Sequence, residues 1–376
     1  MSLRTSAKFW LTLTFGLWLT TACRQSSDNN LGAQQPGEAG DELVGLLEQY
    51  VFEDDPGVVL RIGNREESYM AAYGLADLDA GTPIQTADYL RIGSTSKPMV
   101  SAALLTFVET GDIALDDPIA DYLPADIVEN LAGVDDTTVR QMLQMTSGIP
   151  DYLDTDAFLD AVDGAPSTFW RPEQVLEFAY GEPAAFEPGD DYEYSNSNYI
   201  LAEIIIEALS GQSLAEVLED TVFTPAGMDD CYLETADTFA DNIIRGYDLD
   251  DDDELEDVTE INDGVGLGDG GVVCTAESLA RFLPALMDGD ILGEDVLDEM
   301  LSSVPAGDSA PYGLGIDVTE DSEDGLMVGH GGATSGFQTA LVYFPDDDLS
   351  VVVLTNFVES EILEDITDAA LEWWFE

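Results

Sequence analysis

Runs of apolar residues near both ends of the chain predict β-strands. Close to the N-terminus, residues 57–63 (GVVLRIG) and 67–73 (ESYMAAY) have the composition of two strands joined by a tight turn. Three further strands are predicted near the other end, over residues 326–330 (LMVGH), 336–344 (GFQTALVYF) and 350–355 (SVVVLT).

Helical periodicity occupies the remainder of the chain. Residues 41–52 (DELVGLLEQYVF) place apolar side chains at helical spacing behind an acidic start, and a closing helix is predicted from about Glu361 to Trp374. Between about 98 and 300 the patterns are mainly helical. We therefore expect an α+β fold, in which both termini build one antiparallel sheet with flanking helices and the middle forms an inserted, mainly helical subdomain.

The first 22 residues have the features of an export signal. They contain no acid, and two basic residues precede an apolar run from Phe9 to Leu19, which is too short to span a bilayer. Cys23 follows directly, as in a bacterial lipobox, although Thr20 occupies a position that is usually leucine. Two alternatives are open: a lipid anchor on Cys23, or simple secretion with an incidental cysteine. Either predicts a protein at the cell surface or in the periplasm.

The segment after the signal is polar. Residues 23–40 are rich in Gly, Gln and Asn and lack an apolar period, so we expect a flexible linker. We expect residues 41–376 to form one domain. Hydrophobic residues make up 45% of the whole chain, which is sufficient for a substantial core.

Charge narrows the range of partners. The chain has 78 acidic residues, and beyond residue 22 only nine basic ones, which gives that part a net formal charge of −69. Such a surface repels nucleic acid and anionic lipid, so no nucleic-acid partner is expected, and membrane contact only through a lipid on Cys23. Charge repulsion of this size is screened at molar salt, which favours a high-salt habitat.

Cysteine and histidine usage argues against a metal or other cofactor. Beyond Cys23 the chain has Cys231 and Cys274, which either pair or remain two buried free thiols, and it has one histidine. The acidic run 248–256 (DLDDDDELE) lacks the glycine that a calcium-binding EF-hand loop needs at its sixth position, where Asp253 stands. A solvated loop is the better interpretation.

Candidate chemistry begins at Ser94 and Lys97 in RIGSTSKPMV. Lys97 is the only lysine after residue 8, although the chain elsewhere uses arginine, which cannot accept a proton. A spacing of three puts both side chains on one helix face, and Pro98 belongs in the first turn of a helix that starts at about Ser94 or Thr95. A buried lysine could then deprotonate the serine. The alternative is a surface lysine.

Two further motifs follow along the chain. Tyr194-Ser195-Asn196 offers a phenol and an amide, and by itself also fits a buried tyrosine at a helix start. His330-Gly331-Gly332-Ala333 lies at the end of a predicted strand; a lone histidine is usually structural, but the glycines would let a ligand approach the backbone.

In this order, Ser-x-x-Lys, Tyr-x-Asn and His-x-Gly resemble the serine beta-lactamase and penicillin-binding-protein superfamily, in the class C type branch that includes D-alanyl-D-alanine carboxypeptidases and esterases. The resemblance continues through MLQMTSGIPDY, FTPAGMDD, GGVVCTAESLARF and YGLGI, and covers roughly residues 41–376. One departure is Met145, where the family usually has histidine; we expect altered packing rather than lost activity.

The resemblance implies a role for each motif residue. Ser94 would be the acylated nucleophile, Lys97 its base, and Tyr194 the relay of the proton to the leaving group and from the deacylating water. Asn196 would bind the amide of the substrate.

The last motif would bind substrate as well. His330 and Gly332 match the lysine and glycine of the family's Lys-Thr-Gly motif, and the N–H groups of Ser94 and Ala333 would form the oxyanion hole. Histidine at this position is more typical of peptidase and esterase members than of dedicated beta-lactamases.

We therefore expect a serine hydrolase that forms an acyl-enzyme on Ser94 and resembles the D-alanyl-D-alanine carboxypeptidases, or a related amidase or esterase. A small peptide, amide or ester is the expected substrate. The alternatives are a beta-lactamase or esterase of the same fold, and a surface protein that binds peptidoglycan fragments without turnover.

Overall fold

The computed structural model describes residues 38–240, 242–250, 254–307, 309–321, 325–358 and 360–376. The predicted signal peptide, Cys23 and most of the predicted linker lie outside these residues, as does part of the acidic run at 248–256, so those assignments stay predictions. Within the described ranges, no helix has both the length and the apolar character that crossing a membrane requires.

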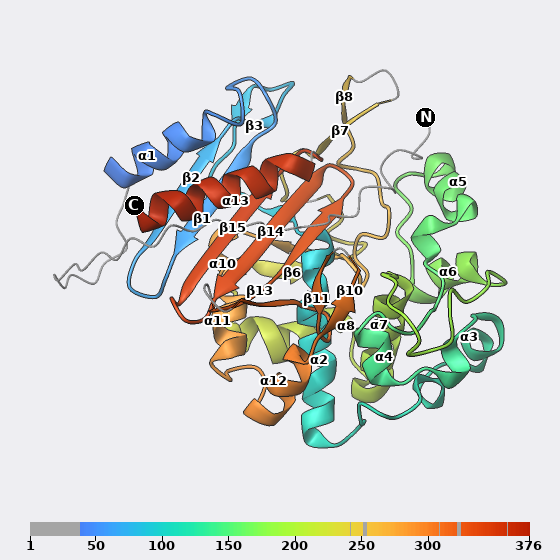
Figure 1. Cartoon of the computed structure of the whole chain (residues 1–376). Helices are drawn as coiled ribbons and strands as arrows, with labels where there is room; N and C mark the ends of the chain where they lie inside the picture. Colours follow the sequence, from blue (N-terminus) through green and yellow to red (C-terminus); the bar gives the residue numbers. More distant parts are fainter. Residues whose placement is uncertain (1–37, 241, 251–253, 308, 322–324, 359) are drawn as a thin grey trace.

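One eight-stranded antiparallel sheet forms the centre of the fold (Figure 1). Its strands, in spatial order, are β10 (Val304–Ala306), β11 (Ser309–Tyr312), β12 (Asp317–Asp321), β13 (Gly325–Thr334), β14 (Phe337–Phe344), β15 (Leu349–Thr355), β1 (Val58–Gly63) and β2 (Ser68–Tyr73). The N-terminal hairpin joins the C-terminal strands where β1 pairs with β15, with Val58 opposite Thr355. The prediction that both termini build one antiparallel sheet is confirmed.

Strand β13 is longer than predicted. The apolar pattern ended the strand at residue 330, whereas the observed strand continues through the glycines to Thr334. Its neighbour β14 pairs with it over that whole stretch, up to Thr334 opposite Phe337, so ladder hydrogen bonds keep a segment of low strand propensity extended.

Helices cover both faces of the sheet and form the insertion between its N-terminal and C-terminal strands. They are α1 (Glu38–Leu47), α2 (Lys97–Thr110), α3 (Ala125–Asn130), α4 (Val139–Leu143), α5 (Asp156–Gly164), α6 (Pro172–Leu176), α7 (Ser197–Ser210), α8 (Leu214–Leu218), α9 (Thr224–Ala226), α10 (Ala276–Leu279), α11 (Phe282–Met287), α12 (Glu294–Leu301) and α13 (Ser360–Phe375). Short 3-10 and π turns lie between them, at η2 (Gly93–Ser96), η3 (Ile119–Asp121), η4 (Val134–Asp136), η5 (Tyr152–Asp154), η6 (Glu177–Ala179) and η7 (Glu219–Phe223). The mainly helical middle is confirmed.

The first helix is displaced from its predicted position. It was expected over 41–52, but it begins at Glu38, so the last three residues of the predicted flexible linker are helical. It ends at Leu47 because the hydrogen bonds of Gln49 and Tyr50 tighten to three-residue spacing before the chain turns toward β1.

Two hydrophobic cores lie on the two sides of the sheet. Helices α1 and α13 cover one face (Figure 1), where Val58, Leu60 and Ile62 of β1 pack with them. The opposite face, which receives Val59, packs against the helical insertion. Because both faces are buried, β1 is apolar on both faces, with Arg61 as its one charged residue, rather than alternating between apolar and polar.

Three small sheets were not predicted. They comprise β3 (Leu75–Asp77) with β4 (Thr82–Pro83), β5 (Leu90–Arg91) with β9 (Val272–Cys274) and β6 (Cys231–Leu233), and β7 (Tyr247–Leu249) with β8 (Leu255–Asp257). Cys231 and Cys274 face each other on β6 and β9 and form a disulfide, so the paired alternative holds. Since β9 also pairs with β5, the disulfide supports the strand that leads into Ser94.

Candidate active site

A tight turn presents Ser94 between β5 and α2. The turn is the 3-10 helix η2, and the α-helix proper starts at Lys97, two or three residues later than predicted. The turn is tight because Ser96 Oγ donates to the Gly93 oxygen at 2.7 Å and accepts from the Val272 N–H at 3.1 Å, which holds it against β9. Pro98 lies in the first turn of α2, as expected.

Lys97 is fully buried beside Ser94. Its Nζ donates hydrogen bonds to Ser94 Oγ at 2.9 Å, to Asn196 Oδ1 at 2.8 Å and to the main-chain oxygen of Asp269 at 2.6 Å. The amide and main-chain oxygens can only accept, so both receive N–H bonds from Lys97 in either of its protonation states. The lone pair of a neutral Lys97 is therefore left facing the Ser94 hydroxyl.

Burial favours the neutral form of Lys97. Burial lowers the pKa of its ammonium to about 8, while the negative charges of Asp269 and Asp151 oppose that fall. A lysine in this state can take a proton and return it near neutral pH.

The Tyr194 ring lies against the same lysine, with Lys97 Nζ 4.9 Å from the ring centroid. Burial raises the pKa of the Tyr194 phenol well above its usual value, and a hydrogen bond with Ser94 works in the opposite direction. The phenol is therefore protonated near neutral pH, which suits a proton donor better than a phenolate base.

Asp151 orients Asn196. The main-chain N–H and the Nδ2 of Asn196 donate to Asp151 Oδ2 at 3.0 and 2.7 Å, just before α7 begins. Because a carboxylate only accepts, the Asn196 amide must point its nitrogen at Asp151 and its oxygen at Lys97. Burial raises the pKa of Asp151 to about 7. The sequence interpretation missed this residue, although it lies in the quoted MLQMTSGIPDY stretch.

Asp269 was also missed. Its buried carboxylate accepts from Tyr152 Oη at 2.7 Å through Oδ2, while Oδ1 has no hydrogen-bond partner among the described residues. Burial raises the pKa of Asp269 to about 6, and the charge of Lys97 lowers it. The preceding residue, Gly268, donates its N–H to the buried Glu203 of α7 at 2.7 Å, which anchors this loop. The only sequence signal was an acid inside a glycine run, GLGDGG.

Strand β13 brings the third motif against the nucleophile turn. At Gly332 a Cβ would come within 2.8 Å of Thr95 Oγ1, and a Cβ on Gly93, whose φ is +52°, would approach the Ala333 nitrogen to 2.8 Å. Both glycines are thus required by close packing. The main chain at Ser94 and Ala333 consequently lies side by side, as an oxyanion hole built from these two residues would need.

His330 is buried and neutral. Burial and the charge of Lys97 lower the pKa of its imidazole to about 3. Its Nδ1 lies 2.5 Å from the Gly331 oxygen, an acceptor, so Nδ1 carries the proton and Nε2 accepts from Tyr312 Oη at 3.1 Å. His330 therefore supplies no positive charge at neutral pH.

Met145 compensates for the missing histidine. It is buried in the left-handed conformation, with φ 60°, and its sulfur accepts from the Ser195 N–H at 3.5 Å and from Asn198 Nδ2 at 3.4 Å. The expected change is thus one of packing: a weakly accepting thioether holds the segment that carries Tyr194 and Asn196.

The chain is similar to known proteins in both sequence and fold. Residues 45–372 match the family model described as Beta-lactamase. The chain is 27% identical over 323 residues to a penicillin-binding protein of Bacillus subtilis (strain 168), which covers 80% of this chain and 68% of that protein. It is also 31% identical over 294 residues to a D-aminopeptidase of Cereibacter sphaeroides. That alignment covers 76% of this chain and 53% of the relative, so the chain spans about half the length of this relative.

A solved structure shows the same fold. The D-amino acid amidase from Ochrobactrum anthropi SV3, complexed with D-phenylalanine, superposes with a TM-score of 0.76 at 25% sequence identity. The alignment covers 89% of this chain and 98% of that chain, which includes both the sheet and the helical insertion.

Proposed function

The chain belongs to the beta-lactamase family, and on that premise we propose that it is a serine hydrolase that cleaves an amide or peptide bond next to a D-amino acid through an acyl-enzyme on Ser94. The observation that carries the proposal is the 2.9 Å contact between Lys97 Nζ and Ser94 Oγ, in which fixed acceptors leave the lysine lone pair for the serine proton. The role of proton acceptor explains why the domain has a lysine, its only one, at position 97.

The first half of the reaction acylates Ser94. Its Oγ attacks the carbonyl carbon as its proton passes to Lys97 Nζ, and the N–H groups of Ser94 and Ala333 stabilise the oxyanion. The Tyr194 phenol then protonates the departing amine, and Lys97 returns the proton to the phenol oxygen. The raised pKa of Tyr194 supports this direction of transfer.

The second half releases the acid. Water attacks the acyl carbon while its proton passes through Tyr194 to Lys97. Lys97 then gives that proton to Ser94 Oγ as the bond between Oγ and the acyl carbon breaks. Asn196, held by Asp151, presents its amide to the substrate.

The names of the relatives support the substrate class. One is a D-aminopeptidase, and the solved neighbour is a D-amino acid amidase, both of which act on bonds at D-amino acids. A carboxypeptidase acting on D-Ala-D-Ala ends is the closest variant of the same reaction, as the penicillin-binding relative suggests.

Labelling tests the mechanism. A fluorophosphonate probe should modify the wild-type protein at molar salt, and Ser94→Ala should abolish labelling, because Ser94 Oγ is the nucleophile that displaces fluoride from the probe. Full labelling of Ser94→Ala would disprove the mechanism. A parallel panel of D-alanine amide, a D-Ala-D-Ala peptide, nitrocefin and a p-nitrophenyl ester separates amidase, carboxypeptidase, beta-lactamase and esterase; no turnover of any would favour the binding protein.

A further inference from the structure

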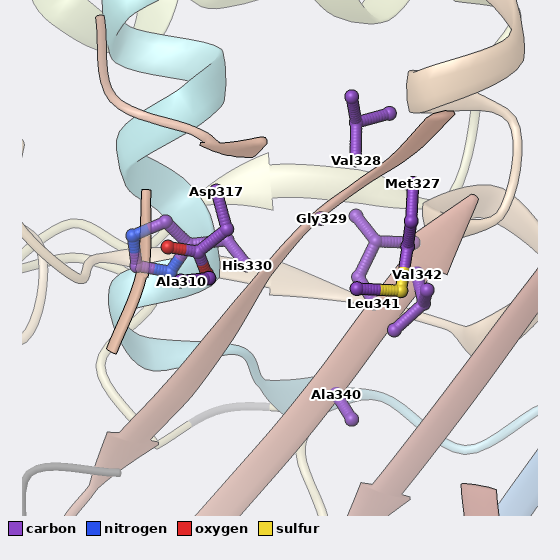
Figure 2. Close-up of a pocket in the computed structure, with 9 residues that line it drawn as sticks. All are labelled: Ala310, Asp317, Met327, Val328, Gly329, His330, Ala340, Leu341 and Val342. Atoms are coloured by element: carbon purple, nitrogen blue, oxygen red, sulfur yellow. The ribbon is translucent and has the colours of Figure 1, made fainter. Parts of the chain in front are cut away.

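The support of β13 changes along its length. Strand β12 pairs with it only as far as Gly329, and His330 is the last of its residues to line a pocket that β12 and β14 also line (Figure 2). Pairing with β14 continues to Thr334. Among the residues that the structure describes, the end of β13 that carries Ala333 therefore has a strand along one edge only.

This end of β13 also has little side-chain packing of its own. Gly331 and Gly332 have no side chains, the turn to β14 contains Gly336, and Ala333 is exposed. Glycine loses more main-chain freedom on folding than any other residue. The N–H of Ala333 must nevertheless keep a fixed direction, because a donor serves an oxyanion only when it is already aimed at it. The segment therefore needs an anchor from outside the strand.

Asp263, in the loop between β8 and β9, holds this segment. Its Oδ1 accepts from Thr334 Oγ1 at 2.9 Å, and its Oδ2 accepts from the main-chain N–H and from the Oγ of Ser335, each at 2.9 Å. A carboxylate only accepts, so it can receive all three donors at once. The three bonds fix the two residues that directly follow Ala333.

The anchor lies on the face of the sheet where the nucleophile turn packs. Side chains two positions apart share a face of a strand, so Thr334 faces the same way as Gly332. At Gly332 a Cβ would come within 2.8 Å of Thr95 Oγ1 in that turn. Asp263 therefore holds the end of β13 from the side on which Ser94 lies.

The loop that carries Asp263 also holds the base. Further along it, the main-chain oxygen of Asp269 accepts from Lys97 Nζ at 2.6 Å. Between these two points, the N–H of Gly268 is bonded to Glu203 of α7, which ties the loop to the helical insertion. One short segment thus connects the strand of Ala333 with the lysine beside the nucleophile.

We propose that Asp263 is a positioning residue for the oxyanion hole, whose carboxylate keeps the Ala333 N–H aimed at the oxyanion formed when Ser94 is acylated. This rests on the proposed acylation of Ser94, but not on which amide is cleaved. A misdirected N–H weakens the binding of the transition state more than the binding of the substrate. The expected signature of losing Asp263 is therefore a fall in kcat rather than a rise in KM.

Steady-state kinetics at molar salt, on the best amide of the panel, measures that signature. Asp263→Ala should lower kcat about tenfold to hundredfold and change KM by less than about threefold. Asp263→Asn should lose less, because its amide oxygen can still accept from Ser335 and the Thr334 hydroxyl can accept from its nitrogen. A wild-type kcat in Asp263→Ala, or an equal loss in both variants, would overturn the proposal.

Asp117→Ala is the matched control. Asp117 is half-buried like Asp263, and it likewise accepts from a main-chain N–H and a hydroxyl, those of Ala114 and Tyr122, at 2.8 Å each. It lies beyond the C-terminal end of α2, the end opposite Lys97. Asp117→Ala should lower the stability to denaturant and leave kcat unchanged. A fall in kcat equal to that of Asp263→Ala would show that general destabilisation, and not the oxyanion hole, explains the loss.

Phenylboronic acid gives a readout that does not depend on the substrate class. Its boron binds Ser94 Oγ as the hydroxyl proton passes to Lys97, and the tetrahedral boronate imitates the oxyanion intermediate. Protection of Ser94 from fluorophosphonate labelling measures its affinity, which Asp263→Ala should weaken about tenfold and Asp117→Ala should not.

The outcomes with phenylboronic acid separate the two proposals. Equal affinity in Asp263→Ala and the wild type would overturn the role of Asp263. A wild type that binds the boronic acid with the expected dependence on Asp263, but cleaves no amide, would refute only the proposed function. A wild type that reacts with neither phenylboronic acid nor the fluorophosphonate would overturn both.

Discussion

Two fully buried bases, Arg91 on β5 and Lys97 at the start of α2, lie six positions apart in similar apolar surroundings. Arg91 is bonded to a carboxylate through two nitrogens, at 2.9 and 3.2 Å from the oxygens of Glu234, and its third contact is the Thr259 oxygen at 2.9 Å. Lys97 donates instead to a hydroxyl, an amide oxygen and a main-chain oxygen. One base is held in a charged pair, and the other among neutral oxygens.

The difference shows that a buried base with a structural role and a buried base that exchanges a proton need different partners. A guanidinium cannot lose its proton, so its burial needs a fixed anion and the pair then fastens β5 to the loop after β6. An ammonium surrounded by neutral acceptors has its pKa lowered into the working range. A lysine is thus required where the proton moves, and an arginine suffices where it does not.

Exchanging the base at the site should have the largest effect. Lys97→Arg keeps the charge but removes the proton acceptor, so kcat/KM should fall about 10³- to 10⁴-fold, or about 4 to 5 kcal/mol of transition-state stabilisation, at every pH. Steady-state kinetics on the best amide of the panel measures the loss, and circular dichroism checks the fold. Activity within tenfold of wild type would mean that another group is the base.

The sequence allowed the catalytic role of Lys97 to be predicted, but not the carboxylates that surround it. Ser94, Lys97, Tyr194 and His330 carry chemistry in a recognisable order, and the structure brings them together. Asp151 and Asp269 were missed because a carboxylate is unremarkable among 78 acids. What distinguishes them is their position in the folded chain.

The fold was predictable to a similar degree. Long apolar runs marked β1, β14 and β15, because strands that are buried on both faces need them. Strands β10 (VPA) and β11 (SAPY) were missed, since each is short and contains proline, and pairing with neighbours rather than propensity keeps them extended.

Breaking the structural pair should have the next largest effect. Arg91→Met leaves Glu234 buried without its cation, which should cost about 3 to 5 kcal/mol in the free energy of unfolding. Denaturant titration at molar salt measures the loss. Arg91→Lys should cost less, because it retains the charge and loses the two-point contact.

A double variant is the control for this second test. Arg91→Met with Glu234→Leu removes both charges, so most of the lost stability should return. If Arg91→Met alone unfolds at the wild-type denaturant concentration, the pair does not hold β5 in place. Arg91 would then have no structural role to contrast with the catalytic role of Lys97.

The smallest expected effect concerns the charge beside the lysine. Asp269→Asn removes a negative charge that raises the pKa of Lys97, so the lysine should lose its proton more readily. Since the neutral lysine is the active form, the acid limb of kcat/KM against pH should move to lower pH, by about one unit. Asp151→Asn should move it in the same direction by less, whereas the exposed Asp298→Asn should leave it in place. An acid limb that stays where it is, or moves upward, in Asp269→Asn would show that neighbouring carboxylates do not set the basicity of Lys97, and that burial alone distinguishes it from Arg91.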